Sequence, residues 1–168
     1  TVNGLSETGV SAIGWSGATS TLIIAYNSTN VDLVSKNSIY NIPDIMNKYI
    51  PGNKHIHKIR TNGKYAFLAT GFGVVVIDLV KKEVYDTWKP GPDASFNEVF
   101  DLTFGNGRIY AATLHGVWFA DLTNLGLAYF GNWSRLNDLP QPDAICNLIL
   151  FSDNRLYINV PDPGGTGD

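Results

Sequence analysis

The sequence predicts an all-β protein built from repeated units, and three observations predict it. The stretch ATGFGVVVIDL at 69–79 recurs as ATLHGVWFADL at 112–122, 43 residues later, with six of eleven residues identical. The segments around both copies are short, rich in Val, Ile, Tyr, Phe and Thr, and separated by turn dipeptides such as Asn62-Gly63 and Asn106-Gly107. Strands joined by hairpins have this composition. No stretch shows the sustained 3.6-residue apolar spacing of a capped helix.

Three complete four-stranded units and half of a fourth follow one another along the chain. In the first unit we expect strands at 10–15, 22–26, 31–34 and 38–42. The second repeats the pattern at 56–60, 65–70, 74–79 and 84–88, and the third at 99–104, 109–113, 117–121 and 129–135. Two further strands, at 145–151 and 156–160, begin a fourth unit.

One turn position recurs in all three complete units. It is occupied by Gly73 and Gly116 in two of them and by Asn30 in the first. We expect a positive φ at this position, because glycine adopts it freely and asparagine tolerates it better than other residues.

Aspartates also recur, near the end of each third strand, as Asp32, Asp78 and Asp121. A short carboxylate at a strand end can accept hydrogen bonds from the N–H groups of the next turn. We therefore expect these three residues to cap turns and not to bind a ligand.

Four-stranded antiparallel units of about 43 to 46 residues match the blades of a β-propeller. The predicted fold is a partial β-propeller of about three and a half blades, at residues 10–44, 56–90, 99–135 and 145–160. The Gly- and Pro-rich tail at 161–168 is typical of the truncated end of a larger chain. An incomplete ring exposes blade faces and strand edges, so we expect self-association through these open edges.

Composition excludes several classes of protein. The chain has 168 residues, 44% of them hydrophobic and 16% charged, as in one globular domain. A net charge of −3 with scattered basic residues predicts no nucleic-acid partner. No apolar run approaches the roughly 20 residues of a membrane span. The single cysteine, Cys146, allows no disulfide, and Trp15 and Trp118 lie inside strands, where we expect them to pack between blades.

The repeat resembles a known one. Its best copy, NGRIYAATLHGV at 106–117, and the pairs GLS at 4–6 with VSAI at 10–13 and DLP at 138–140 with ICNL at 145–148, resemble the two-component-regulator propeller repeat of bacterial extracytoplasmic proteins. LIIAYNSTNVDL at 22–33, IYNIPDI at 39–45 and GFGVVVIDL at 71–79 are similar to the N-terminal propeller of PorZ-type proteins of the Bacteroidetes. The resemblance covers most of residues 4–160.

This resemblance implies a function. PorZ-type proteins carry two such propellers and a small β-sandwich and are surface accessories of type IX secretion, so the chain corresponds to about a quarter of a relative. It implies an exported, periplasmic or cell-surface binding scaffold that supports the export and attachment of cargo, with protein partners or surface glycan. Two alternatives stay open: the ligand-sensing propeller of a hybrid two-component regulator, and a hydrolase propeller.

Catalytic motifs are missing from the sequence. It has no nucleophile elbow, no H-E-x-x-H and no phosphate-binding glycine loop, so we predict no enzyme and no cofactor. His55 and His57 alternate on one strand face and His115 could join them, but no carboxylate is spaced to complete a metal site. We therefore expect no bound metal.

Four aromatic or imidazole side chains are the candidate binding residues. Phe72 and His115 lie at the turn tips, where the two copies of the repeat differ. Trp88 and Trp133 lie near strand ends, where an exposed indole can stack on a sugar or anchor a protein. For both tryptophans, burial under a connecting loop is the favoured interpretation, and a binding role is the alternative.

Overall fold

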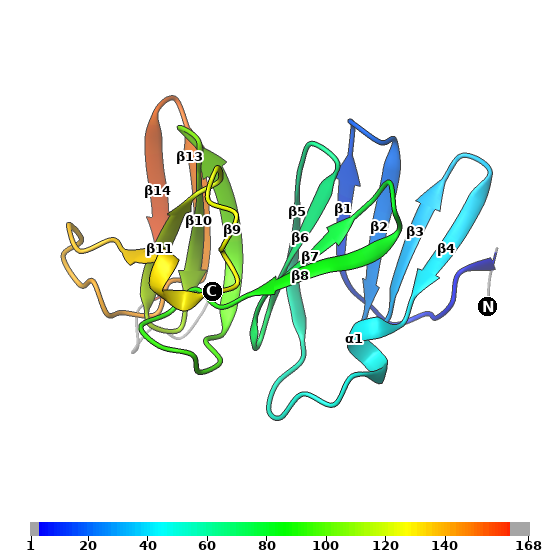
Figure 1. Cartoon of the computed structure of the whole chain (residues 1–168), viewed down its shortest axis with the longest axis horizontal. Coiled ribbons are helices and arrows are strands. Elements are labelled where there is room, and N and C mark those ends of the chain that lie inside the picture. Colours follow the sequence, from blue (N-terminus) through cyan, green and yellow to red (C-terminus); the bar gives the residue numbers. More distant parts are fainter. Residues whose placement is uncertain (1–3, 162–168) are drawn as a thin grey trace.

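Four antiparallel sheets of four, four, four and two strands follow one another along the chain in the computed structural model, which describes residues 4–161 (Figure 1). Blade 1 consists of β1 (Val10–Ser16), β2 (Thr21–Tyr26), β3 (Val31–Ser35) and β4 (Ser38–Ile42). Blade 2 consists of β5 (Ile56–Asn62), β6 (Tyr65–Thr70), β7 (Gly73–Asp78) and β8 (Glu83–Trp88). Blade 3 consists of β9 (Val99–Gly105), β10 (Arg108–Thr113), β11 (Gly116–Asp121) and β12 (Ser134–Arg135), and a half blade consists of β13 (Leu148–Ser152) and β14 (Arg155–Asn159).

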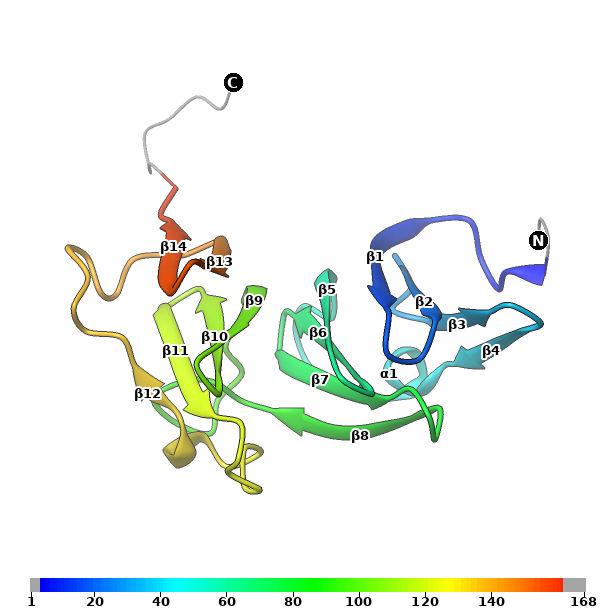
Figure 2. The same cartoon turned by 90° about the horizontal axis from the view of Figure 1, so that it is seen from above.

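The sheets are arranged as an open fan. Within each blade every strand pairs with the next one in sequence. The first strands, β1, β5, β9 and β13, lie beside one another on the inner side, and β4, β8 and β12 lie on the outer side (Figure 2). The sheets do not close into a ring. This arrangement confirms the predicted all-β, partial propeller fold.

The core is divided into three layers, one between each pair of successive blades. Side chains of a strand alternate between its two faces. In β6, Ala66 and Leu68 therefore pack toward blade 1, and Phe67 and Ala69 pack toward blade 3. All six residues of β7 are buried, because this strand is covered on both faces.

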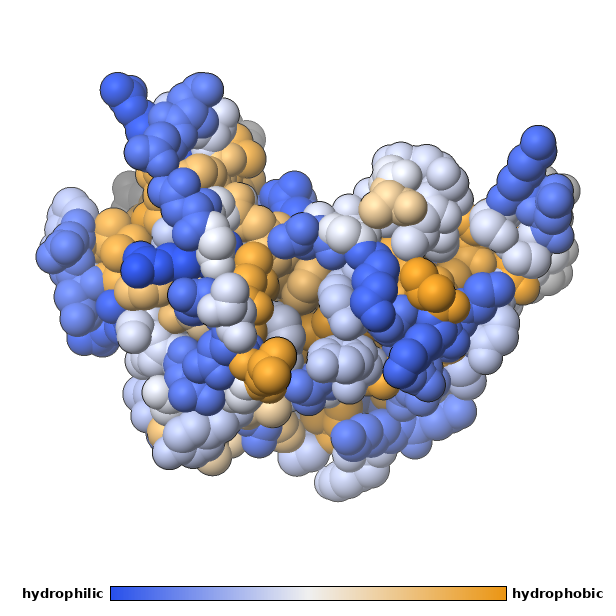
Figure 3. Space-filling model, turned by 45° about the horizontal axis from the view of Figure 1, so that its top comes forward, coloured by the Kyte–Doolittle hydropathy of each residue, from blue (hydrophilic) through white to orange (hydrophobic). Residues whose placement is uncertain are grey.

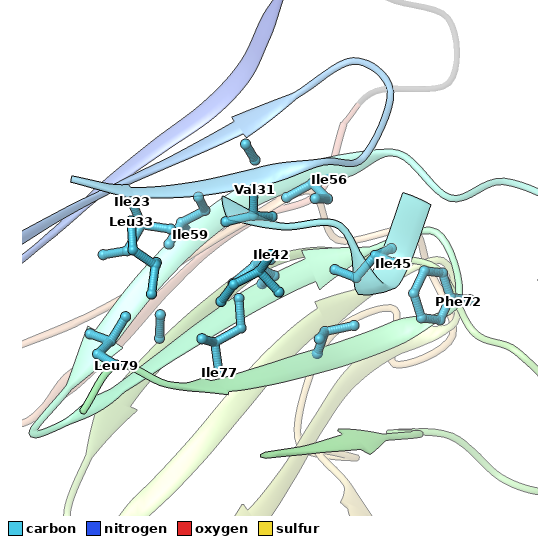
Figure 4. Packing of buried hydrophobic residues seen from close by; sticks show 14 residues of the cluster. Ile23, Val31, Leu33, Ile42, Ile45, Ile56, Ile59, Phe72, Ile77 and Leu79 are labelled. Atoms are coloured by element: carbon cyan, nitrogen blue, oxygen red, sulfur yellow. The ribbon is translucent and has the colours of Figure 1, made fainter. Parts of the chain in front are cut away.

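The first layer, between blades 1 and 2, is almost wholly aliphatic (Figure 4). Ile23, Leu33 and Ile42 of blade 1 face Ile59 and Ile77 of blade 2. Each such side chain contributes about 1.5–3 kcal/mol when it is fully buried. On the outside, hydrophilic residues cover much of the surface and hydrophobic residues show between them (Figure 3).

The doubled sequence has a local structural cause. The hydroxyl of Thr70 donates to the carbonyl of Gly73 at 2.9 Å, and the hydroxyl of Thr113 donates to that of Gly116 at 2.8 Å. Both glycines have a positive φ, of 132° and 82°. A Cβ at Gly73 would also collide with the carbonyl oxygen of Trp88. The shared Thr and Gly are therefore the residues that close this turn.

The corresponding turn of blade 1 is built differently. The positive φ falls on Thr29, at 71°, so the prediction of a positive φ at Asn30 is wrong. The side chain of Asn30 instead accepts a hydrogen bond from the Val31 N–H at 3.0 Å and donates to Glu7 at 3.1 Å. Asparagine is present here for its side-chain hydrogen bonds.

The three recurring aspartates do not share one role. Asp78 and Asp121 accept hydrogen bonds from backbone N–H groups of the following turn, as predicted. Asp32 lies within β3, where it accepts from the Ser6 N–H and the Tyr26 hydroxyl, each at 2.7 Å. The prediction is wrong for Asp32, which instead anchors the segment before β1 to blade 1.

The strand expected at 129–135 forms only over Ser134–Arg135. A short 3₁₀ helix, η2 (Phe130–Asn132), precedes it. The side chain of Asn132 donates to the carbonyl of Gly126 at 2.8 Å, and the indole of Trp133 donates to that of Leu127 at 2.9 Å. Such side-chain bonds to the backbone compete with strand pairing.

Two further details differ from expectation. The strand expected at 145–151 begins at Leu148, because the Cys146 N–H bonds the carbonyl of Thr113 at 3.0 Å. One helical turn, α1 (Asp44–Asn47), joins blades 1 and 2. Within residues 4–161, no helix has the length and apolar character needed to cross a membrane. Most of the predicted tail, 162–168, lies outside the described residues.

Candidate functional site

A large hollow of the described surface lies beside α1. Propeller blades diverge outward, so strand side chains alone do not fill the space between the outer parts of blades 1 and 2. The connection containing α1 enters this space and leaves a hollow of about 780 Å³. We call it the α1 groove; it is lined by Pro43, Asp44, Ile45, Asn47, Lys48, Tyr49, Ile50, Phe72, Val75, Val84, Thr87, Lys89 and Phe96.

Lys54 holds one wall of the groove in place. Its ammonium group donates to the carbonyl oxygens of Ile45, Met46 and Lys48 at 2.9, 2.9 and 3.1 Å. These carbonyls end a helical turn and need partners from outside it. Ile45 is buried in the first core layer. The wall is therefore fixed by a charge on one side and by packing on the other.

The opposite wall is the loop after β8. The Lys89 ammonium donates to the carbonyl of Ala94 at 3.0 Å and lies 4.9 Å from the centre of the Phe96 ring. Hydrogen bonds from Ser95 lower the pKa of the Asp93 carboxyl in the same loop. These contacts within the loop hold Phe96 at the rim of the groove.

Phe72, one of the sequence-predicted binding residues, forms part of the groove floor. Its ring is buried, and a binding role for Phe72 stays a prediction. It meets Phe96 edge to face, with ring centroids 6.1 Å apart. Tyr49, on the other wall, is 90% exposed. The groove thus combines an apolar floor with two aromatic rims.

The groove is chemically suited to binding. Its lining holds two cations, Lys48 and Lys89, but only one carboxylate, Asp44, and neither His nor Cys. General acid–base or nucleophilic catalysis needs paired groups within hydrogen-bond reach. Aromatic rings beside lysines can instead bury an apolar group of a partner and attract an adjacent anionic group.

Trp88 and Trp133 lie together, but inside the molecule. Their ring centroids are 6.3 Å apart in the layer between blades 2 and 3. The Trp88 indole donates to Asp86 at 2.9 Å, and both rings are more than 90% buried. Burial under a connecting loop is the interpretation that the sequence favours for both tryptophans, and the connection from β11 to β12 packs over them. Direct binding by these rings stays a prediction.

His115 is exposed at a separate hollow of about 580 Å³. Its carbonyl accepts the indole N–H of Trp118 at 3.0 Å, and Trp118 is buried as expected. An Arg135–Asp143 ion pair borders the same hollow. The structure thus does not bring His115 and Phe72 together, and a binding role for His115 stays a prediction.

The other two histidines form a structural contact. The rings of His55 and His57 meet edge to face at 4.8 Å, and His57 Nε2 lies 2.8 Å from a carboxylate oxygen of Glu98. This contact links blade 2 to the start of blade 3. Residues 4–161 contain no cluster of three or more His, Cys, Asp or Glu side chains that could hold a metal ion.

Sequence reasoning missed three exposed aromatic side chains. Trp15 was expected to pack between blades, and it is 59% exposed. The reason is that no described blade covers that face of β1. Tyr49 and Phe96 lie in loops, where the sequence offers only an isolated aromatic residue beside Gly and Pro as a signal.

An open array of successive antiparallel blades defines a partial β-propeller domain. A family model described as "TSS9, PorZ, N-terminal beta-propeller domain" matches residues 1–134. The chain therefore belongs to the PorZ N-terminal β-propeller family, as the sequence resemblance predicted.

Solved structures place the chain in the same fold. It is similar to PorZ of Porphyromonas gingivalis, described as an essential bacterial surface component of the type IX secretion system, with 26% identity and a TM-score of 0.73 over 94% of this chain and 22% of that one. The extracellular domain assigned to a hybrid two-component system of B. thetaiotaomicron has 15% identity and a TM-score of 0.64, over 92% of this chain and 22% of that one. The chain thus spans about a fifth of either relative. A search of curated proteins gave no match.

Proposed function

We propose that this chain is a non-catalytic binding domain of an exported protein, at the periplasmic or outer face of a Gram-negative cell, that supports type IX secretion and the surface attachment of cargo. The observation that carries the proposal is the family match over residues 1–134. The similarity to P. gingivalis PorZ, at 26% identity, supports it.

The α1 groove is the binding surface in this proposal, and a protein is its partner. An apolar partner side chain fits between Tyr49 and Phe96, over the buried ring of Phe72. Lys48 and Lys89 favour a carboxylate next to that side chain. Surface glycan is the other partner class that the sequence predicts; it would use the same rings by stacking.

A chimera tests the function. Residues 4–161 replace the matching segment of PorZ in a P. gingivalis strain that lacks its own copy, and type IX cargo at the cell surface is measured. We expect the chimera to restore surface cargo. A chimera that reaches the surface in normal amount and leaves cargo unattached contradicts the proposed function.

A groove variant tests the site separately. Tyr49→Ala combined with Phe96→Ala removes both rims and should lower surface cargo severalfold. Leu125→Ala is the matched control, because Leu125 is an exposed apolar side chain that does not line the groove. Equal amounts of surface cargo in both variants would contradict the groove as the binding surface, but not the proposed function in secretion.

The second candidate function is ligand sensing. It is favoured by the motif NGRIYAATLHGV at 106–117, which resembles the repeat of two-component-regulator propellers. The full reading frame discriminates between the two functions. If that frame encodes a membrane-spanning helix followed by histidine-kinase motifs, the protein is a sensor and the scaffold function is contradicted.

A further inference from the structure

A smaller hollow, of about 290 Å³, opens between blade 2 and the connection that joins β11 to β12. We call it the β8 hollow, because β8 supplies three of its lining residues, Tyr85, Asp86 and Trp88. It shares no lining residue with the α1 groove, which lies between blades 1 and 2. Blades 2 and 3 each pack against a neighbour on both sides, so a further blade of the ring would not cover this hollow.

Four aromatic rings line the β8 hollow in a continuous row. The ring centroids of Tyr85 and Tyr65 are 5.3 Å apart, and those of Tyr65 and Phe67 are 6.4 Å apart. Phe67 in turn lies 5.6 Å from Trp88. Phe67 and Trp88 are buried and form the floor, whereas Tyr85 is 53% exposed and forms a wall. The faces of such rings carry partial negative charge and attract cations.

A bulge in β8 brings a carboxylate into the same hollow. Val84 pairs with Ile77 and Asp86 pairs with Val76, so Tyr85 has no partner on β7. Neighbouring residues of a regular strand point to opposite faces, but an extra residue at a bulge changes this alternation. Tyr85 and Asp86 therefore both line the hollow, although they are adjacent in sequence.

The carboxylate of Asp86 is fixed in position and has acceptor capacity left. One of its oxygens accepts the Thr87 N–H at 2.7 Å, and the other accepts the indole N–H of Trp88 at 2.9 Å. A carboxylate has about four acceptor sites, so each oxygen can accept a further hydrogen bond. Within residues 4–161, Asp86 forms no ion pair.

The charge of the hollow favours a cation. Asp86 is the one charged side chain among the described residues that line it. Tyr65 already makes one cation–π contact outside the lining, because the Lys64 ammonium lies 4.9 Å from the centre of its ring. That ammonium is paired with Asp78 at 2.8 Å, so its charge is balanced by another carboxylate.

We propose that the β8 hollow binds the guanidinium group of an arginine in a protein partner. A guanidinium is planar, stacks on aromatic faces and donates two parallel hydrogen bonds to a carboxylate, which fits the two free acceptor positions of Asp86. The volume lies at the lower end of the range for ligand sites, about 300–1,000 Å³, and suits one side chain. The lining holds no cation for the carboxylate of free arginine, so the arginine belongs to a polypeptide.

Titration of the isotope-labelled full chain with N-acetyl-arginine amide, followed by NMR, tests the site. We expect shifts at the amides of Tyr85 and Asp86 and a dissociation constant on the order of 1 mM, as suits a single side chain. The citrulline analogue has nearly the same shape but no charge, and it should bind about tenfold more weakly. Free arginine should bind no more tightly than the amide; tighter binding would contradict a partner protein as the source.

Variants separate this site from general attraction of a cation to the chain. Asp86→Asn keeps an oxygen for the Trp88 indole but loses the charge, and it should weaken binding about tenfold. Tyr85→Ala should weaken binding about threefold. Glu83→Gln is the matched control, because Glu83 is an exposed carboxylate of the same strand outside the hollow. Its affinity should equal that of the wild type.

The amide spectrum away from β8 shows whether each variant is folded. Equal affinities for the arginine and citrulline probes overturn the proposal. Binding that neither Asp86→Asn nor Tyr85→Ala weakens, or no shift at β8 in the wild type, also overturns it. None of these outcomes bears on the α1 groove or on the proposed role in secretion, because the probe experiment requires neither.

Discussion

Phe104 of β9 packs against Phe67 of β6 across the boundary between blades 2 and 3, with ring centroids 4.9 Å apart. The Phe67 ring also meets Trp88 at 5.6 Å. Aromatic pairs contribute about 0.5–1.5 kcal/mol beyond the area that they bury. The stability of the blade stack therefore depends strongly on this one side chain.

Phe67→Ala should lower the free energy of unfolding by about 3–5 kcal/mol, because it leaves a cavity between two blades and removes both ring contacts. Urea denaturation measures the loss. Leu125→Ala is the control and should change the stability by less than about 0.5 kcal/mol, since the Leu125 side chain is almost fully exposed. A loss below about 1 kcal/mol for Phe67→Ala would show that the blades adhere without this ring.

Asp101 connects three successive blades. Its buried carboxylate accepts two hydrogen bonds from the Arg60 guanidinium of β5, at 3.0 and 2.9 Å. It also accepts the N–H groups of Leu102 and, from β13, Ile149, at 2.8 and 3.3 Å.

Asp101→Ala should therefore destabilise the chain by about 2–4 kcal/mol, because it removes the acceptor of several buried donors. Chemical denaturation measures the change. Glu83→Ala breaks the exposed Lys81–Glu83 pair, at 3.6 Å, and should cost under about 0.5 kcal/mol. Similar losses for the two variants would mean that Asp101 contributes no more than a surface charge.

The strands were predictable from sequence because local signals and burial agree. Turn dipeptides mark the hairpins, and the bounds of β4 and β6 match the predicted ranges 38–42 and 65–70. The prediction fails at 129–133, where side chains of Asn132 and Trp133 bond the backbone of a preceding loop. The sequence has strand composition there, and only the tertiary contacts select the loop.

Exposure was much less predictable than secondary structure. Trp15 and Trp88 both lie in strands, yet one is exposed and the other is buried. The exposure of each ring depends on whether a neighbouring blade or loop covers it. The residues around each tryptophan in the sequence do not reveal this. For the same reason the α1 groove, whose walls come from residues about 40 apart in sequence, carries no recognisable motif.

Ionisation of Tyr26 should lower the free energy of unfolding at alkaline pH. Burial, and then the hydrogen bond from its hydroxyl to Asp32, raise its pKa to about 12. The folded chain therefore holds this proton more tightly than the unfolded chain, whose tyrosines have pKa values near 10. The resulting stabilisation is complete below about pH 10 and is lost as the pH rises toward 12.

Tyr26→Phe tests this linkage. The variant should lose about 1–2 kcal/mol at neutral pH, since Asp32 loses a buried donor. Its stability should then fall less steeply than that of the wild type between pH 10 and 12, by on the order of 2 kcal/mol in total. Denaturant midpoints measured from pH 8 to 12 give both values. Parallel curves for the two proteins would show that Tyr26 is not the titrating group.

The turns before and after β6 provide a final test, because their glycines differ in the space around them. Gly63 and Gly73 both have a positive φ, of 57° and 132°. A Cβ at Gly63 meets open space, whereas one at Gly73 would collide with the carbonyl oxygen of Trp88. Gly63→Ala should therefore cost only the strain of a left-handed alanine, about 1–2 kcal/mol.

Gly73→Ala adds to that strain a clash with a paired strand, so it should cost at least about 2 kcal/mol more. Urea unfolding of the two variants side by side gives the difference directly. Equal losses would mean that the close approach of the neighbouring strand relaxes without cost.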